Sequence, residues 1–119
     1  MSVKNRNSVV EDGLVFYVDA SNTNSYPGSG TTWTDMVSSN IGTLTNGPSF
    51  DSANGGSIDF DGSNDRTDFP DNSSFKPTGS MTLLVWAKGQ SGSTSIGIIG
   101  ALGSSGNRGY FMGCNTTQF

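Results

Sequence analysis

The chain has 119 residues, a formal net charge of −4, no histidine and one cysteine. This length predicts a single domain. Without histidine, Ser-His-Asp and Cys-His nucleophiles and His-containing zinc sites are excluded. The lone Cys114 excludes an internal disulfide and a Cys-rich metal site. Six basic residues in an acidic chain predict no nucleic-acid partner, and no apolar run approaches the roughly 20 residues of a membrane-spanning helix.

The residues that build hydrophobic cores are scarce. Gly, Ser, Thr and Asn make up about half of the chain, and Ile, Leu, Val and Phe only about a fifth. The low net charge and the 10% aromatic content nevertheless differ from the composition of disordered chains. We therefore expect a folded domain with a thin core. Short β-type runs separated by turn residues, without helical periodicity, favour an all-β sandwich or barrel.

Residues 1–12 form a polar N-terminal arm ahead of the expected sandwich domain, 13–119. The arm carries Val3, Val9 and Val10 among charged and polar residues, and it is too polar to fold alone. Arms of this kind become ordered on a neighbouring chain. Two interpretations remain open here: contact of these valines with a partner, or a disordered tail.

Three strands are expected in the first half of the domain. The continuous apolar run 14–18 is typical of a strand that is buried on both faces. Residues 43–45 form a short alternating strand. In 57–60, Ile58 and Phe60 are expected to point inward, and the glycines on either side supply the turns. Residues 20–32 and 70–80 are expected to be loops.

The longest expected strand is 81–87, and a hairpin follows it. Thr82, Leu84 and Trp86 share one face of this strand, and Trp86 is expected in the core. The hairpin has arms 96–102 and 110–112. Its first arm has few charges to block pairing with another chain. We expect residues 1–12 and 96–119 to be ordered mainly by other chains or by more of the same chain, and the contact residues expected in the first arm are Ile96, Ile98 and Ile99.

Five phrases in a fixed order carry a resemblance to a known family. They are GLVFYVDA at 13–20, SYPGSGTTWTD at 25–35, GTLTNGP at 42–48, GGSIDFDGSND at 55–65 and MTLLVWA at 81–87. Together they resemble the laminin-G-like, concanavalin A-like jelly roll. The second and third phrases are similar to those of structural proteins of tailed bacteriophages. The resemblance covers about residues 13–113 and implies an all-β jelly-roll sandwich.

The chain departs from this family pattern in its length. A family domain continues after the strand around 110–113 with roughly as many strands again. Three interpretations stay open: a minimal variant, a fragment of a longer chain, or a fold whose missing strands another chain supplies. The jelly roll is accordingly expected to be incomplete.

Aspartates gather between positions 59 and 71, which suggests a metal site. Carboxylates at such spacing could hold Ca²⁺, which takes six to eight oxygen ligands. The alternative is structural: Asp61 and Asp65 cap turns through backbone N–H groups, and Asp59 and Asp68 point outward from strands. No other cofactor is expected. The residues of this weak calcium-site hypothesis are Asp59, Asp61, Asp65, Asp68 and Asp71.

Two aromatic residues near a Gly/Ser/Thr-rich loop suggest a second kind of site. Trp33 and Tyr26 could stack on a sugar, whereas the alternative for Trp33 is that it plugs the edge of the sandwich. Glycoside hydrolysis needs two facing carboxyl groups. Glu11, the only glutamate, lies in the arm, and nothing in the sequence selects an aspartate pair.

These observations favour a non-enzymatic protein. The resemblance implies a virion structural protein of a tailed phage, made in the host cytoplasm. Its expected role is an exposed accessory element, such as a capsid decoration protein or a fibre or tail component. The expected partners are other virion proteins, including copies of the same chain. The alternative function is a carbohydrate-binding module that contacts glycans of a host surface.

Overall fold

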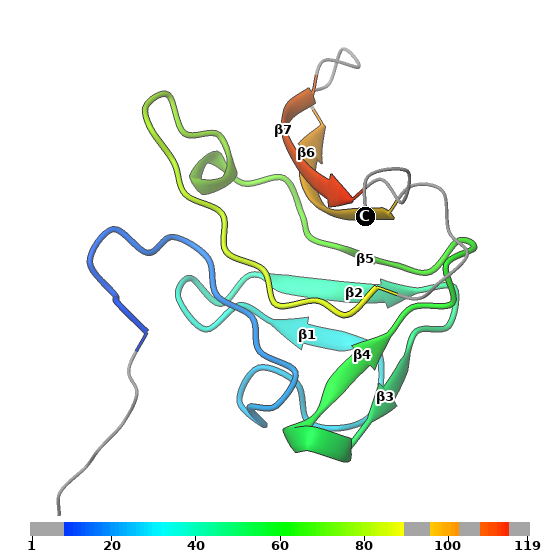
Figure 1. Cartoon of the computed structure of the whole chain (residues 1–119). Helices are drawn as coiled ribbons and strands as arrows, with labels where there is room; N and C mark the ends of the chain where they lie inside the picture. Colours follow the sequence, from blue (N-terminus) through cyan, green and yellow to red (C-terminus); the bar gives the residue numbers. More distant parts are fainter. Residues whose placement is uncertain (1–8, 90–95, 103–107, 115–119) are drawn as a thin grey trace, which may run out of the picture.

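The computed structural model describes residues 9–89, 96–102 and 108–114 and contains strands and two short 3-10 turns. Three small sheets are formed, with strand orders β1-β2-β5, β3-β4 and β6-β7. Figure 1 shows the first two sheets close together and the β6-β7 hairpin apart from them. The expected β-rich fold is confirmed. The element bounds are β1 Thr32–Thr34, β2 Ile41–Thr45, β3 Ser49–Asp51, η1 Ala53–Gly55, β4 Ser57–Asp59, β5 Arg66–Asp68, η2 Ser73–Phe75, β6 Ile96–Leu102 and β7 Arg108–Cys114.

The three-stranded sheet has one face toward the protein and one toward solvent. Its strands are antiparallel, and Trp33 lies opposite Gly42 while Leu44 lies opposite Thr67. Residues opposite each other, and residues two apart on one strand, point to the same side of a sheet. These four residues therefore share the inner face, where Gly42 and Leu44 are buried. Thr43 lies on the outer face and is exposed.

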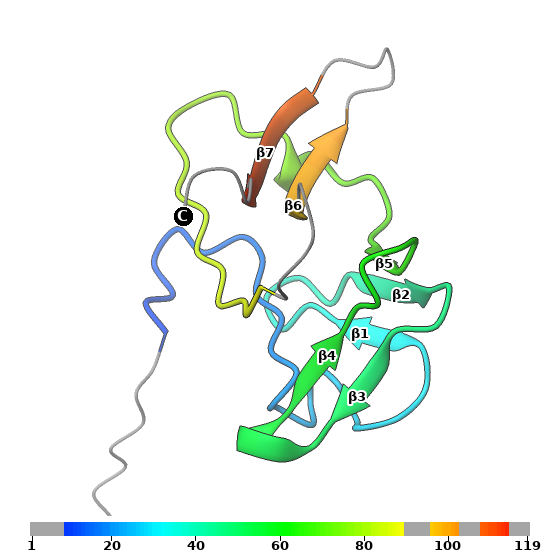
Figure 2. The ribbon, with the colours of Figure 1, turned by 45° about the vertical axis from the view of Figure 1, so that its right-hand side comes forward.

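The two hairpins follow from turn chemistry and apolar patterning. Between β3 and β4, Asn54 and the two glycines after it have positive φ angles, which glycine and asparagine tolerate best. The Asp51 carboxylate also accepts a hydrogen bond from the N–H of Ala53. Antiparallel pairing of β6 with β7 confirms the expected hairpin, with register shifts near Gly97 and Ala101. Figure 2 shows the two hairpins at opposite ends of the molecule.

Two strands expected from sequence are not formed in the described residues. The segment 14–18 has no ladder pairing, and Val15 is exposed rather than buried. The segment 81–87 has no strand assignment, and Trp86 is fully exposed, so its expected place in the core is wrong. Phe60 is also exposed, although Ile58 is half-buried as expected. The apolar pattern identified these runs, but it does not show whether neighbouring strands are present to pair with them and cover them.

The core is thin, as the composition predicted. Among the described residues, the fully buried apolar side chains are Tyr26 and Leu44. Around them, Phe16 makes edge-to-face contacts with Phe69 and Phe75, at centroid distances of 4.9 and 5.3 Å. Aromatic pairs of this geometry contribute about 0.5–1.5 kcal/mol beyond burial of their area. No helix in the described part of the chain is long and apolar enough to cross a membrane.

Gly42 provides the space in which the Phe69 ring lies. A Cβ atom at position 42 would stand 2.7 Å from two ring atoms of Phe69 and nearer still to Cζ. We expect Gly42→Ala to lower the free energy of unfolding by about 1–3 kcal/mol, because overpacking forces the ring to move. Urea denaturation measures this change.

Gly79→Ala is the matched control for this substitution. An added Cβ there meets no atom within 4 Å, so the free energy of unfolding should change by no more than about 0.5 kcal/mol. Equal stabilities of the Gly42→Ala and wild-type chains would show that Phe69 does not pack on β2.

Candidate functional site

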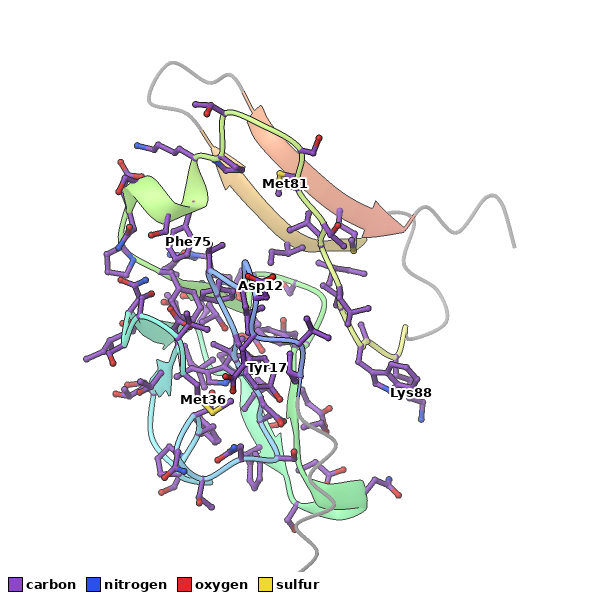
Figure 3. The ribbon with its side chains drawn as sticks, turned by 90° about the vertical axis from the view of Figure 1, so that its left-hand side faces the viewer. Asp12, Tyr17, Met36, Phe75, Met81 and Lys88 are labelled. Carbon is purple, nitrogen blue, oxygen red and sulfur yellow. The ribbon has the colours of Figure 1, made fainter. Side chains whose placement is uncertain are left out.

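Asp35 fastens the 14–18 segment to the end of β1. Its side chain is 1% exposed, and its Oδ1 accepts hydrogen bonds from the backbone N–H groups of Tyr17 and Val37, at 2.9 and 3.0 Å. The N–H of Met36 donates in return to the carbonyl of Tyr17, at 2.8 Å. Figure 3 shows Tyr17 and Met36 close together. A carboxylate thus takes the place that a strand carbonyl has in a β-ladder.

The second oxygen of Asp35 organises the turn that follows β1. Oδ2 accepts from the hydroxyl and the N–H of Ser38, at 2.5 and 3.3 Å, and from the amide of Asn40. The side-chain oxygen of Asn40, Oδ1, accepts a hydrogen bond from the side-chain amide of Asn72. This bond links the turn to the segment before η2. One buried carboxylate therefore joins three parts of the chain.

Ser25 has the same role two residues further along the chain, at Asp19. It is buried, and its hydroxyl donates to the carbonyl of Thr34 at 2.8 Å while accepting from the N–H of Asp19 at 3.0 Å. The N–H of Thr34 donates to the carbonyl of Ser25. We call Ser25 and Asp35 the polar anchors, since both hold the first segment against β1 by side-chain hydrogen bonds.

The lowered pKa values of the carboxyl groups of Asp35 and Asp19 suit a structural role. Burial alone raises the pKa of Asp35, but hydrogen bonds from the Ser38 hydroxyl and from three backbone N–H groups outweigh burial and lower this pKa below its usual value. The pKa of Asp19 is also lowered, because hydrogen bonds from Ser21 and Tyr17 outweigh its burial. A general acid needs a raised pKa instead. These carboxylates therefore stay ionised at neutral pH.

Four of the five aspartates of the calcium hypothesis serve turns and ion pairs, and the fifth is exposed on a strand. Asp61 Oδ1 accepts from the N–H of Ser63, and Asp65 Oδ2 accepts from the N–H of Asp61, as the turn-capping alternative predicted. Asp68 pairs with Arg66, and Asp71 with Lys76, on the surface. Asp59 is exposed on β4. Across residues 9–89, 96–102 and 108–114, no three His, Cys, Asp or Glu side chains gather where they could hold a metal ion.

The two aromatic residues of the sugar-binding hypothesis are buried to different degrees. Tyr26 is 3% exposed, its ring packs 5.3 Å from that of Phe50, and its hydroxyl donates to the carbonyl of Gly30. Trp33 is half-buried on the inner face of the sheet, and its indole N–H is buried. The alternative, that Trp33 fills the edge of the folded body, agrees with this position.

The predicted partner residues lie in several environments. Val9 and Val10 are exposed in a stretch without regular structure. Ile98 and Ile99 are half-buried in β6, and Ile96 begins that strand. Val3 and most of the arm lie outside the described residues. Val9 and Val10 do not share a strand with the isoleucines.

Sequence analysis missed the exposure of the apolar segment 81–87, which holds the two most exposed large apolar side chains among the described residues. These are Leu84, which is 91% exposed, and Trp86, which is fully exposed, whereas the alternate residues Leu83 and Val85 are half-buried. This alternation shows an extended backbone with one side on the protein and one in solvent. The signal was present: apolar residues on both faces of one run indicate that both faces require cover. Figure 3 shows the run between Met81 and Lys88 along the outside of the molecule.

The backbone of this segment is also without partners in the described structure. No ladder and no turn hydrogen bond joins residues 81–89 to another described residue. Exposed N–H and C=O groups beside apolar side chains are the features of an edge strand that can pair with another chain. We therefore regard 81–87 as the candidate functional surface.

Comparisons with known proteins identify no relative. No family model matches the chain, and neither a curated protein nor a solved structure matches it.

The lowered pKa of Asp35 gives a defined pH dependence. Its ionised form adds stability that is complete above the unfolded-state pKa, near 3.8, and this stability is lost as the pH falls through the lower pKa of the folded chain. We expect Asp35→Asn to lower the free energy of unfolding by about 1–3 kcal/mol at pH 7. Urea titrations from pH 7 to pH 2 measure the loss of unfolding free energy. They also show whether the stability of Asp35→Asn depends less on acid pH than that of the wild-type chain.

Asp59→Asn is the control, because Asp59 is exposed on β4. This variant should keep the stability and the acid dependence of the wild-type chain. An Asp35→Asn variant as stable as wild type, with an unchanged acid limb, would contradict the anchoring role of Asp35.

Proposed function

We propose that the chain is a non-enzymatic structural protein of a tailed phage particle. It serves as an exposed accessory element, such as a capsid decoration protein or a fibre or tail component. The five ordered phrases between residues 13 and 87 support the virion role by their resemblance to phage structural proteins. The same phrases support a concanavalin A-like jelly-roll sandwich as the fold.

The observation that carries this proposal is the exposed apolar segment 81–87. Soluble monomers seldom leave a large contiguous apolar surface in water, and such surfaces commonly bind other proteins. Here Leu84 and Trp86 lie together on one side of a backbone that lacks partners among the described residues. A protein that is held by neighbours in an assembly has a use for such a surface.

The chemistry of the carboxylates supports a role without catalysis. The two with shifted pKa values, Asp19 and Asp35, are both shifted downward by hydrogen bonds to backbone and hydroxyl groups. Catalytic acids and bases usually have pKa values moved toward the working pH. These two carboxylates thus stabilise the segments around them, and the proposal needs no reacting group.

A carbohydrate-binding module remains the second candidate, and one observation favours it. Trp86 offers both faces of its ring to solvent, as a sugar-stacking residue must. The aliphatic neighbour Leu84 and the backbone groups without described partners suit a protein strand better than a glycan. Saturable quenching of tryptophan fluorescence by a glycan, lost in Trp86→Ala and kept in Trp33→Phe, would favour the module instead.

Mass spectrometry of purified phage particles tests the proposed function. We expect this protein in a constant ratio to the major capsid or tail protein across gradient fractions and preparations, because a structural component occupies fixed positions. A soluble host protein of similar size, followed through the same gradient, is the control for carry-over. Absence from the particles, or a ratio that varies with the host-protein control, would contradict the proposal.

A further inference from the structure

The segment 81–87 is the C-terminal part of an uncharged stretch with a lysine at each end. Residues 77–87 contain no charged side chain, and Lys76 and Lys88 flank them. Short runs with β-forming residues, low charge and no proline favour pairing with identical runs. Residues 81–87 contain no proline and include three β-prone residues, Thr82, Val85 and Trp86.

We propose that this segment pairs antiparallel with the same segment of a second copy of the chain. The inference rests on the proposed function, for which it names the neighbour. In a two-fold arrangement centred on Val85, Trp86 of each copy lies opposite Leu84 of the other. Pairs that are opposite in antiparallel strands have side chains on one face and contact each other. Both exposed apolar residues are then covered by one interaction.

A partner strand meets the hydrogen-bonding needs of the segment's backbone, whereas a smooth apolar surface does not. When apolar side chains are covered, the backbone groups beside them also leave water and require hydrogen-bond partners. No described residue supplies such partners to residues 82–86. A second strand supplies N–H and C=O groups at the matching spacing. Leu83 and Val85 keep their half-buried contacts with their own chain, because they point to the other side.

Charge and area both favour a second copy as the occupant. In the two-fold arrangement each Lys88 lies opposite Thr82 of the other copy, so the two lysines are about 20 Å apart, beyond the screening length at physiological salt. Covering a tryptophan removes roughly 150–250 Å² from water. Full burial of both Trp86 rings would supply at most about a third to a half of the roughly 1,000 Å² of a specific interface. The Leu84 side chains and the paired backbones cover the remainder.

Analytical ultracentrifugation of the whole chain across concentration tests this inference. We expect the mass to double from 12.4 kDa as the concentration rises. Tryptophan emission should shift to the blue in parallel, because Trp86 leaves water. Leu84→Lys should abolish both changes while keeping the circular dichroism spectrum, since this side chain is 91% exposed. If Leu84→Lys alters the circular dichroism spectrum, Trp86→Thr serves as the second variant. Its association is followed by mass alone, because the tryptophan reporter is removed.

Ile41→Lys is the matched control, because Ile41 is an exposed aliphatic residue on a different element, β2. It should dimerise as the wild-type chain does. A wild-type chain that stays monomeric, or a dimer that persists in Leu84→Lys and Trp86→Thr, would overturn the inference. A monomer found at constant ratio in particles would refute only this pairing. A dimer absent from particles would refute only the virion role.

Discussion

Hydrogen bonds that two buried polar side chains, Asp35 and Ser25, make with the backbone take the place of a β-ladder in this protein, and the arrangement of its first half depends on them. The 14–18 segment has the composition of a central strand, yet it is held beside β1 near its C-terminal side, through Asp35 at Tyr17 and through Ser25 at Asp19. Buried polar groups are costly unless their bonds are complete. Each oxygen of Asp35 accepts at least two hydrogen bonds, so burial of this carboxylate is compensated.

This mode of attachment has consequences for the rest of the molecule. Side-chain anchors fix a segment at two points, whereas a ladder fixes every second residue and aligns the faces of neighbouring strands. The sheets stay small, the core is limited to a few aromatic contacts, and the apolar run 81–87 finds cover on one side only. Because apolar residues are scarce, the core of the described residues is thin and does not cover Leu84 and Trp86. These two side chains remain free for contacts outside the described chain.

Sequence patterns predicted local structure well and long-range pairing poorly. Turn residues such as Asn54 and the glycines after it are local signals, and the β3-β4 turn and the β6-β7 hairpin were predicted correctly. Turn capping by Asp61 and Asp65 was the predicted alternative to a calcium site, because capping is also a local signal. The run 81–87 misled, because a pattern apolar on both faces shows that cover is required but not which chain provides it. Asp35 was not singled out, since a lone aspartate after a strand has no sequence signal that separates a buried anchor from a surface turn.

Hydrogen exchange of individual backbone amides tests the central claim most directly. The account predicts slow exchange at Tyr17, Met36 and Asp19, whose N–H groups bond to an anchor or to the segment that the anchors hold. It predicts fast exchange at residues 82–86 in a dilute sample and slower exchange as the concentration rises. Fast exchange at Tyr17, or protection of 82–86 that does not depend on concentration, would show that the chain pairs its own strands and would contradict the account.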